Sequence, residues 1–125
     1  MYKINEDQSI YVTRGDAISF IVGALDEEGN NYVFKPTDTV RFSVFNKKAC
    51  HLVELRKDFS VPVESEVVEI FLTGEDTKIG EHISKPVDYW YEVELNPNSL
   101  PQTIIGYDED GPKVFRLFPE GGGLV

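Results

Sequence analysis

The chain has 125 residues, enough for one domain with a hydrophobic core and too few for two. Hydrophobic residues make up 41% and charged residues 27%, which is typical of a folded protein and argues against disorder. The 22 acidic and 12 basic residues give a formal net charge of -10, which repels phosphate backbones and anionic lipids, so neither nucleic acid nor a membrane surface is an expected partner.

Apolar residues recur at every second position along most of the chain, in short runs separated by turn-forming clusters, which is typical of β-strands. The alternating positions are Ile10 and Val12; Ile18, Phe20 and Val22; Val40, Phe42 and Val44; Val53 and Leu55; Val68, Ile70 and Leu72; Tyr89, Tyr91, Val93 and Leu95; Ile104; and Phe115 and Leu117. About seven or eight short strands result, the number expected of a two-sheet sandwich. We therefore predict an all-β, antiparallel β-sandwich.

Two acidic clusters predict turns. DEEGNN at residues 26–31 and DEDGP at residues 108–112 supply the Asp, Asn and Gly that a hairpin needs for positive φ and for side chains that bond their own backbone. Asp108, Glu109 and Asp110 could also offer oxygen ligands to calcium, but no Glu stands at the closing position of a full calcium loop. A hairpin tip is favoured, no cofactor or metal is predicted, and weak calcium binding stays open.

One segment is a candidate for helical structure, LTGEDTKIGEHI at residues 72–83. Thr73 and Asp76 have the spacing of a helix cap, and Gly80 can end a helix. We expect one short helical turn there.

The chain is predicted to form one domain with a short tail and to be synthesised in the cytoplasm. Residues 1–119 form the predicted domain, and the glycine-rich residues 120–125 form a predicted flexible tail. The N-terminus, MYKINEDQSI, carries charges where an export signal needs an apolar run, and no stretch has the length of a membrane helix. The single cysteine, Cys50, excludes an internal disulfide and indicates folding in a reducing compartment.

The tripeptide Arg14-Gly15-Asp16 is the sequence that animal cell-adhesion receptors read on extracellular ligands. A receptor ligand needs the tip of a projecting loop, whereas here only three or four residues separate two predicted strands. Gly15 permits a sharp change of direction. We therefore interpret the tripeptide as a corner of the chain and expect Arg14 and Asp16 to be exposed flanking charges.

No catalytic constellation is recognisable, and we predict that the chain is not an enzyme. Cys50 and His51 are neighbours, and neighbours on a strand point to opposite faces, so they do not form a nucleophile and base. With the distant His82 they lack the spacing of a metal site. Glu92 and Glu94 would lie about 6.6 Å apart, a separation that glycosidases use, but they project side by side instead of flanking a bond.

Trp90 is the most informative surface candidate. It shares one face of a predicted strand with Asp88, Glu92 and Glu94. An indole can stack on a sugar ring while neighbouring acids accept hydrogen bonds from the hydroxyls. A solvated sheet face or an interface aromatic is the favoured interpretation. These four residues are therefore the predicted ligand or interface residues, with a glycan as a possible partner.

Three parts of the chain join strand runs to acidic or glycine turns in a fixed order. They are VTRGDAISFIV (residues 12–22) with the turn that follows it; DTVRFSVF (38–45); and EIFLTGEDTKIG (69–80), which leads into YWYEVEL (89–95), TII (103–105) and KVFRL (113–117). In order and spacing the chain resembles the N-terminal domain of phage baseplate upper proteins and related immunoglobulin-like structural proteins of phage tails. The most specific elements are the L-T-x-x-D-T run and the Y-x-Y-x-V-x-L strand.

This resemblance implies an immunoglobulin-like sandwich that is a non-enzymatic structural or assembly module of a phage or prophage tail or baseplate. It implies localisation in the virion, contacts with other tail or baseplate proteins, and a homo-oligomer in the particle. It also implies that the stretch around Gly15 is a turn leading into a core strand. The alternative function is that of a carbohydrate-binding module that uses Trp90.

Overall fold

The computed structural model describes residues 2–49, 52–81 and 83–120, and these residues form nine β-strands and no α-helix. The strands are β1 (Tyr2–Ile4), β2 (Ile10–Thr13), β3 (Ile18–Val22), β4 (Thr39–Phe45), β5 (Val53–Ser60), β6 (Val68–Leu72), β7 (Val87–Leu95), β8 (Gln102–Ile105) and β9 (Lys113–Phe118). All of the predicted strand runs are confirmed. None of the described segments has the helical length and apolar character that a membrane crossing requires.

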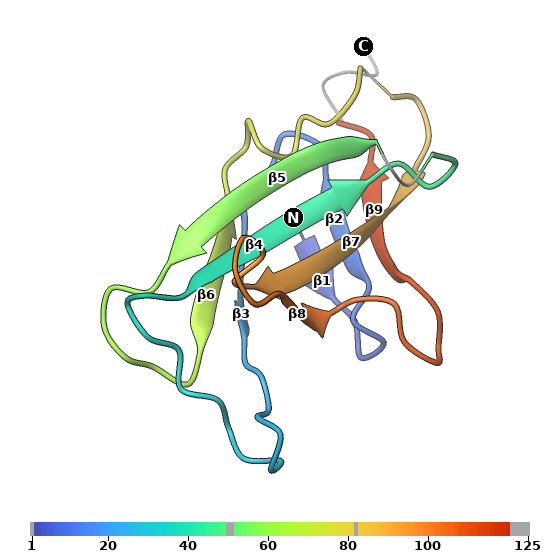
Figure 1. The fold of residues 1–125 in the computed structure, drawn as a ribbon. Helices are drawn as coiled ribbons and strands as arrows, with labels where there is room; N and C mark the ends of the chain where they lie inside the picture. Colours follow the sequence, from blue (N-terminus) through green and yellow to red (C-terminus); the bar gives the residue numbers. More distant parts are fainter. Residues whose placement is uncertain (1, 50–51, 82, 121–125) are drawn as a thin grey trace.

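The strands form two sheets that face each other across the core (Figure 1). The larger sheet has the order β1-β2-β9-β7-β4-β5, with β8 also paired to β7, and the smaller sheet consists of β3 and β6. The predicted all-β sandwich is thus confirmed. One pairing differs from the antiparallel expectation, because β2 and β9 run parallel. The chain crosses to the other sheet after β2, so no hairpin dictates the direction of its neighbour.

The first strand, β1, was not predicted. Its three residues are all exposed, and it pairs antiparallel with β2 at the edge of the larger sheet. A strand with no buried face lacks the alternation of apolar and polar residues that reveals the other strands.

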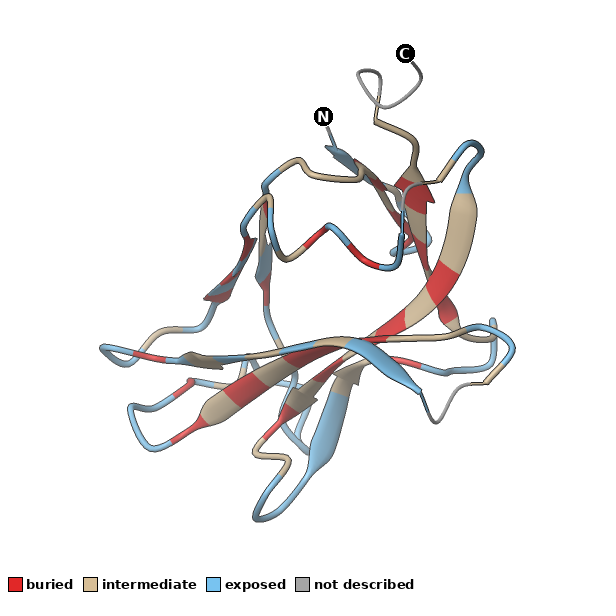
Figure 2. Ribbon diagram, turned by 90° about the horizontal axis from the view of Figure 1, so that it is seen from above, coloured by how far each residue is buried: buried red, intermediate tan, exposed pale blue. Residues whose placement is uncertain are grey.

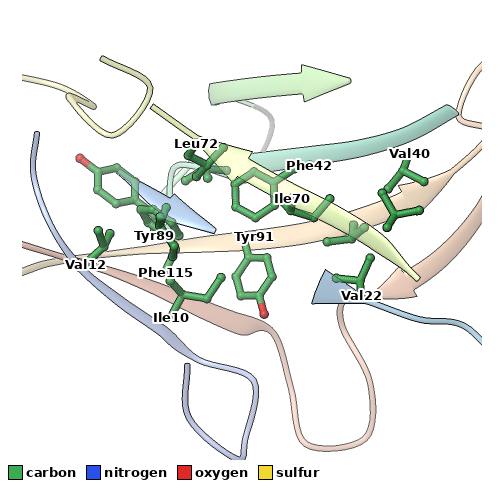
Figure 3. Packing of buried hydrophobic residues seen from close by; sticks show 14 of the residues in the cluster. Ile10, Val12, Val22, Val40, Phe42, Ile70, Leu72, Tyr89, Tyr91 and Phe115 are labelled. Carbon is green, nitrogen blue, oxygen red and sulfur yellow. The ribbon is translucent and has the colours of Figure 1, made fainter. Parts of the chain in front are cut away.

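The core lies between the sheets and is centred on Phe42, which is fully buried. The centroid of its ring lies 5.5 Å from that of Tyr91, 6.1 Å from Phe20 and 6.2 Å from Phe115, so residues of β4, β7, β3 and β9 meet there. Figure 3 shows Phe42, Tyr91 and Phe115 among the buried side chains of the core. Buried and less buried residues alternate along the strands, as Figure 2 shows for β7. Burial of each such side chain contributes roughly 1.5–3 kcal/mol.

Both predicted acidic turns are confirmed by their hydrogen bonds. The Gly29 N–H donates to the Asp26 carbonyl at 3.0 Å, and the Gly111 N–H donates to the Asp108 carbonyl at 2.9 Å. The first turn closes the connection from β3 toward β4, and the second lies between β8 and β9.

The expected helical turn is a hydrogen-bonded turn and not a helix. The predicted capping pair forms, because the Thr73 N–H donates to Asp76 Oδ2 at 2.8 Å and the Asp76 N–H donates to Thr73 Oγ1 at 3.2 Å. Only one bond of α-helical spacing follows, from the Thr77 N–H to the Thr73 carbonyl at 3.3 Å, together with one i→i−3 bond from the Lys78 N–H to the Glu75 carbonyl at 3.2 Å. Thr77 is fully buried against the corner after β2, and this tertiary contact ends the turn before a helix can propagate.

Candidate functional site

The four predicted site residues occupy the outer side of β7. Asp88, Trp90, Glu92 and Glu94 are each half-buried and alternate with the buried core residues of the strand. The strand therefore presents one indole and three carboxyl groups away from the core. Their surroundings differ, so each has to be considered separately.

Asp88 is occupied by an ion pair with Arg116 on the neighbouring strand β9. The Arg116 guanidinium donates from Nε to Oδ1 at 2.7 Å and from Nη2 to Oδ2 at 3.2 Å, and it also lies 4.9 Å from the ring centroid of Tyr11. The bond from Arg116 holds the pKa of Asp88 below its usual value. Asp88 thus ties β7 to β9, and its oxygens are already engaged.

Trp90 lines a shallow hollow of about 240 Å³ on the outer side of the larger sheet. Phe45, its partner on β4, is one lining residue, and the others are Tyr91, Glu92, Tyr107, Pro112 and Lys113. The Tyr107 side chain is 78% exposed. We call this the Trp90 hollow. Its aromatic walls and single carboxyl group suit a flat, partly apolar ligand with hydroxyl groups.

Glu92 has an unusual environment. Burial raises the pKa of its carboxyl group, and the negative charge of the neighbouring Glu94 acts in the same direction. Ser43, its partner on β4, is fully buried, and its Oγ is the one buried side-chain polar atom without a hydrogen-bond partner among the described residues. A buried hydroxyl group without a hydrogen-bond partner thus lies at the residue that pairs with Glu92.

Replacement of Glu92 by glutamine should stabilise the protein at pH 7. The folded-state pKa is raised, so the charged form is disfavoured by folding; this cost is full above the folded pKa and disappears below the unfolded pKa of about 4.3. Because the group is partly solvated, we expect a gain below about 1 kcal/mol in the free energy of unfolding. Urea titrations at pH 7 and pH 4 measure it. The exposed Glu69→Gln is the control, and a gain that persists at pH 4 would contradict this cause.

Arg14 does not project into solvent, and the expectation that it would be exposed is wrong. Its side chain is only 13% exposed and forms an ion pair from Nη1 to Glu120 Oε1 at 2.6 Å. Nε donates to the Ile79 carbonyl at 3.2 Å, and Nη2 donates to the Gly80 carbonyl at 2.8 Å. Asp16 is half-buried as well. Glu120, assigned by sequence to the tail, is thus tied to the domain, and the domain boundary stays a prediction.

The tripeptide forms a corner, as predicted. Gly15 has a φ of 92°, a conformation that favours glycine, and its N–H donates to Thr77 Oγ1 at 3.0 Å. The Thr77 hydroxyl donates in turn to the Asp16 carbonyl at 2.8 Å. A side chain at Gly74 would place its Cβ 2.6 Å from the Gly15 carbonyl oxygen. The corner is therefore locked to the turn after β6 and is not a projecting loop.

The acidic turn between β8 and β9 is held by hydrogen bonds to the carboxylate of its own residue Asp108. Asp108 Oδ2 accepts from Lys113 Nζ at 2.8 Å, and Oδ1 accepts from the Asp110 N–H at 2.9 Å. These bonds, led by that from Lys113, hold the pKa of Asp108 below its usual value. Within residues 2–49, 52–81 and 83–120, no three His, Cys, Asp or Glu side chains are grouped as metal ligands would be.

The expectations that Cys50 and His51 do not form a nucleophile and base, and that with His82 they do not form a metal site, concern residues outside the described ones. They stay predictions.

Several apolar residues on the outer side of the sheets or in loops were not singled out by sequence. Phe45 and Tyr107 line the Trp90 hollow, while Ile21 on β3 and Phe71 on β6 are 66% and 43% exposed on the smaller sheet. For the three of these residues that lie on strands, the sequence carried a signal that could have identified them. Ile21, Phe45 and Phe71 are apolar at positions that the alternation assigns to the outer side, as is Trp90.

Comparison of the chain with family models, with curated proteins and with solved structures finds no match. The function therefore has to be inferred from these surfaces and from the motifs of the chain.

Proposed function

We propose that this protein is a non-enzymatic structural or assembly module of a phage or prophage tail or baseplate, acting through protein–protein contacts in the virion. The observation that carries the proposal is the outer face of the small sheet, which we call the β3–β6 face. Ile21 and Phe71 on this face are 66% and 43% exposed, and Val67, which precedes β6, is 45% exposed.

The apolar residues of the β3–β6 face are neighbours. Ser19 pairs with Phe71 and Ile21 pairs with Glu69, which makes Ile21 and Phe71 diagonal neighbours on one side of the sheet. Single exposed apolar residues are normal on protein surfaces, whereas contiguous ones mark contact sites. The face thus suits burial against another tail or baseplate protein.

The motifs that resemble the phage proteins support the same assignment. VTRGDAISFIV contains the end of β2, the corner and β3, and EIFLTGEDTKIG contains most of β6 and the turn that follows it. The two motifs are joined through Thr77, which bonds both Gly15 and Asp16. Together they form one structural unit, and the outer side of that unit is the β3–β6 face.

The proposal predicts that the chain is a component of particles produced by prophage induction in its source bacterium. Mass spectrometry of purified particles should detect it at an abundance comparable to other tail proteins. A chain carrying Ile21→Lys and Phe71→Lys should be excluded, because a charged side chain cannot be buried in an apolar contact without a partner. The control is Ile21→Val with Phe71→Leu, which keeps the face apolar.

Two outcomes of this experiment would contradict the proposal. Particles that contain other tail proteins but not this chain would exclude the virion role. Incorporation of the lysine variant at the wild-type level would exclude the β3–β6 face as the contact.

A carbohydrate-binding function is the second candidate, and the Trp90 hollow favours it. A sugar ring stacked on Trp90 would place its hydroxyls near the Glu92 carboxyl group. On this hypothesis, Trp90→Ala lowers the affinity for a glycan found on an array by at least about tenfold, a difference of about 1.4 kcal/mol. The control is Val114→Ala, which changes the residue that pairs with Trp90 on β9 and keeps the indole. Equal binding by wild type and Trp90→Ala would reject the hypothesis.

A further inference from the structure

Two turns of opposite charge lie at opposite ends of β7. The turn with Asp26, Glu27 and Glu28 borders a hollow together with Leu95 at the end of the strand. The turn that follows β4 borders a second hollow together with Val87 at the start of the strand. The nine residues of β7 separate the ends by roughly 25–30 Å. Figure 1 shows the first turn extending away from the sheets at the bottom and the second at the upper right.

The positively charged end has more cationic side chains than carboxylates. Its hollow, of about 650 Å³, is bordered by Lys47, Lys48, Lys85 and Arg116, against one carboxylate. That carboxylate belongs to Asp88 and is bound to Arg116. For the three lysines, no carboxylate of the described residues lies within ion-pair distance of the amino group. In a chain of net charge -10 this is a local positive surface, which we call the basic hollow.

The negatively charged end presents two adjacent carboxylates. Asp26 is committed to the turn, because its Oδ1 accepts from the Glu28 N–H and the Asn30 N–H, both at 2.9 Å. Glu27 and Glu28 are exposed, and no ion pair involves them within the described part of the chain. The turn is thus held in shape by one acid while the other two stay available.

We propose that the occupant of the basic hollow is the acidic turn of a second copy of this chain. Glu27 and Glu28 of one copy would pair with Lys47 and Lys48 of the next, with Lys85 on the other side of the hollow. Two adjacent glutamates of one copy thus face two adjacent lysines of the next copy. Such charge complementarity across a contact selects the partner.

The position of the turns determines the kind of assembly. Because the two surfaces lie at opposite ends of the molecule, the contact is head-to-tail, and each copy keeps one free end. Such contacts generate rings when the rotation closes and stacks when it does not. The inference rests on the proposed assembly role for its biological setting and names a second copy as one of the partners.

Charge reversal tests the contact. Sedimentation velocity at low salt should show self-association of the wild type that weakens as salt is added. A basic-end variant, Lys47→Glu with Lys48→Glu, and an acidic-end variant, Glu27→Lys with Glu28→Lys, should each associate with themselves at least about tenfold more weakly. Mixed together, the two variants should associate, because the native acidic turn of the basic-end variant matches the native basic hollow of the acidic-end variant, and the reversed turn of the second matches the reversed hollow of the first. The variant with all four changes should regain self-association.

A matched control separates this contact from a general effect of charge. Lys3→Glu with Lys35→Glu changes the net charge as the basic-end variant does but lies outside the basic hollow, so it should associate as the wild type does. A wild type that stays monomeric at low salt would overturn the inference, as would reversed variants that fail to associate when mixed. Ile21→Lys with Phe71→Lys should keep the salt-dependent association in solution, so failure of the β3–β6 face is distinguishable.

Discussion

Replacement of Phe42 by alanine is expected to lower the free energy of unfolding by roughly 3–5 kcal/mol. Phe42 is fully buried, and its ring contacts those of Phe20, Tyr91 and Phe115 from three other strands. Truncation removes the apolar area and leaves a cavity where the two sheets meet. Chemical denaturation followed by the fluorescence of Trp90, the single tryptophan, measures the loss.

The free energy of unfolding of a whole domain is about 5–15 kcal/mol, so this loss is a large fraction of it. The variant therefore has to be measured at low temperature and low denaturant. Phe42→Leu, which keeps much of the volume, provides a second variant with a smaller loss. Phe118→Ala is the control, because Phe118 is half-buried and its ring contacts only that of Tyr11 among the described residues. A loss at Phe42 no larger than at Phe118 would contradict the position of the core.

Replacement of Arg14 by methionine is expected to cost about 2–4 kcal/mol. The guanidinium pairs with Glu120 and donates to the carbonyls of Ile79 and Gly80. Its removal leaves a partly buried carboxylate and two carbonyls without their donor. The effect should be seen as a lower midpoint in urea with an unchanged slope, since the compactness of the fold is retained.

The controls for Arg14 address its geometry and its charge. Arg14→Lys keeps the charge but has no planar fork, so it should recover only part of the loss. Lys78→Met removes a cation whose side chain is 44% exposed and whose ion pair with Glu75 measures 3.4 Å, and it should change stability by less than about 0.5 kcal/mol. If Arg14→Met behaved like Lys78→Met, the corner would not be docked as described.

The candidate site was predictable in part. The period-two pattern placed Asp88, Trp90, Glu92 and Glu94 on one side of a strand, and the structure places them so. The pattern could not show that Asp88 is neutralised by Arg116 on β9 or that Tyr107 forms a wall beside Trp90. Strand partners and loop paths are set by contacts between distant parts of the chain, and alternation carries no information about them.

The turn after β6 shows where local signals are overridden. Thr73 and Asp76 form the capping bonds that their spacing predicts, yet no helix follows. The fully buried hydroxyl of Thr77 is bonded to the corner at Gly15 and Asp16 instead. One helical turn is too short to be stable by itself, so a tertiary contact determines its outcome.

The sequence by itself determined the class of the fold, the location of the strands with a buried face and the chemistry of the turns. These features depend on residues two to four positions apart, because consecutive side chains on a strand point to opposite sides and turn residues bond their own backbone. Only the tertiary structure decided the parallel pairing of β2 with β9, the burial of Arg14 and the two charged ends of the molecule. Arg14 meets a partner 106 positions away, and a contact over that distance depends on the packing of the whole chain.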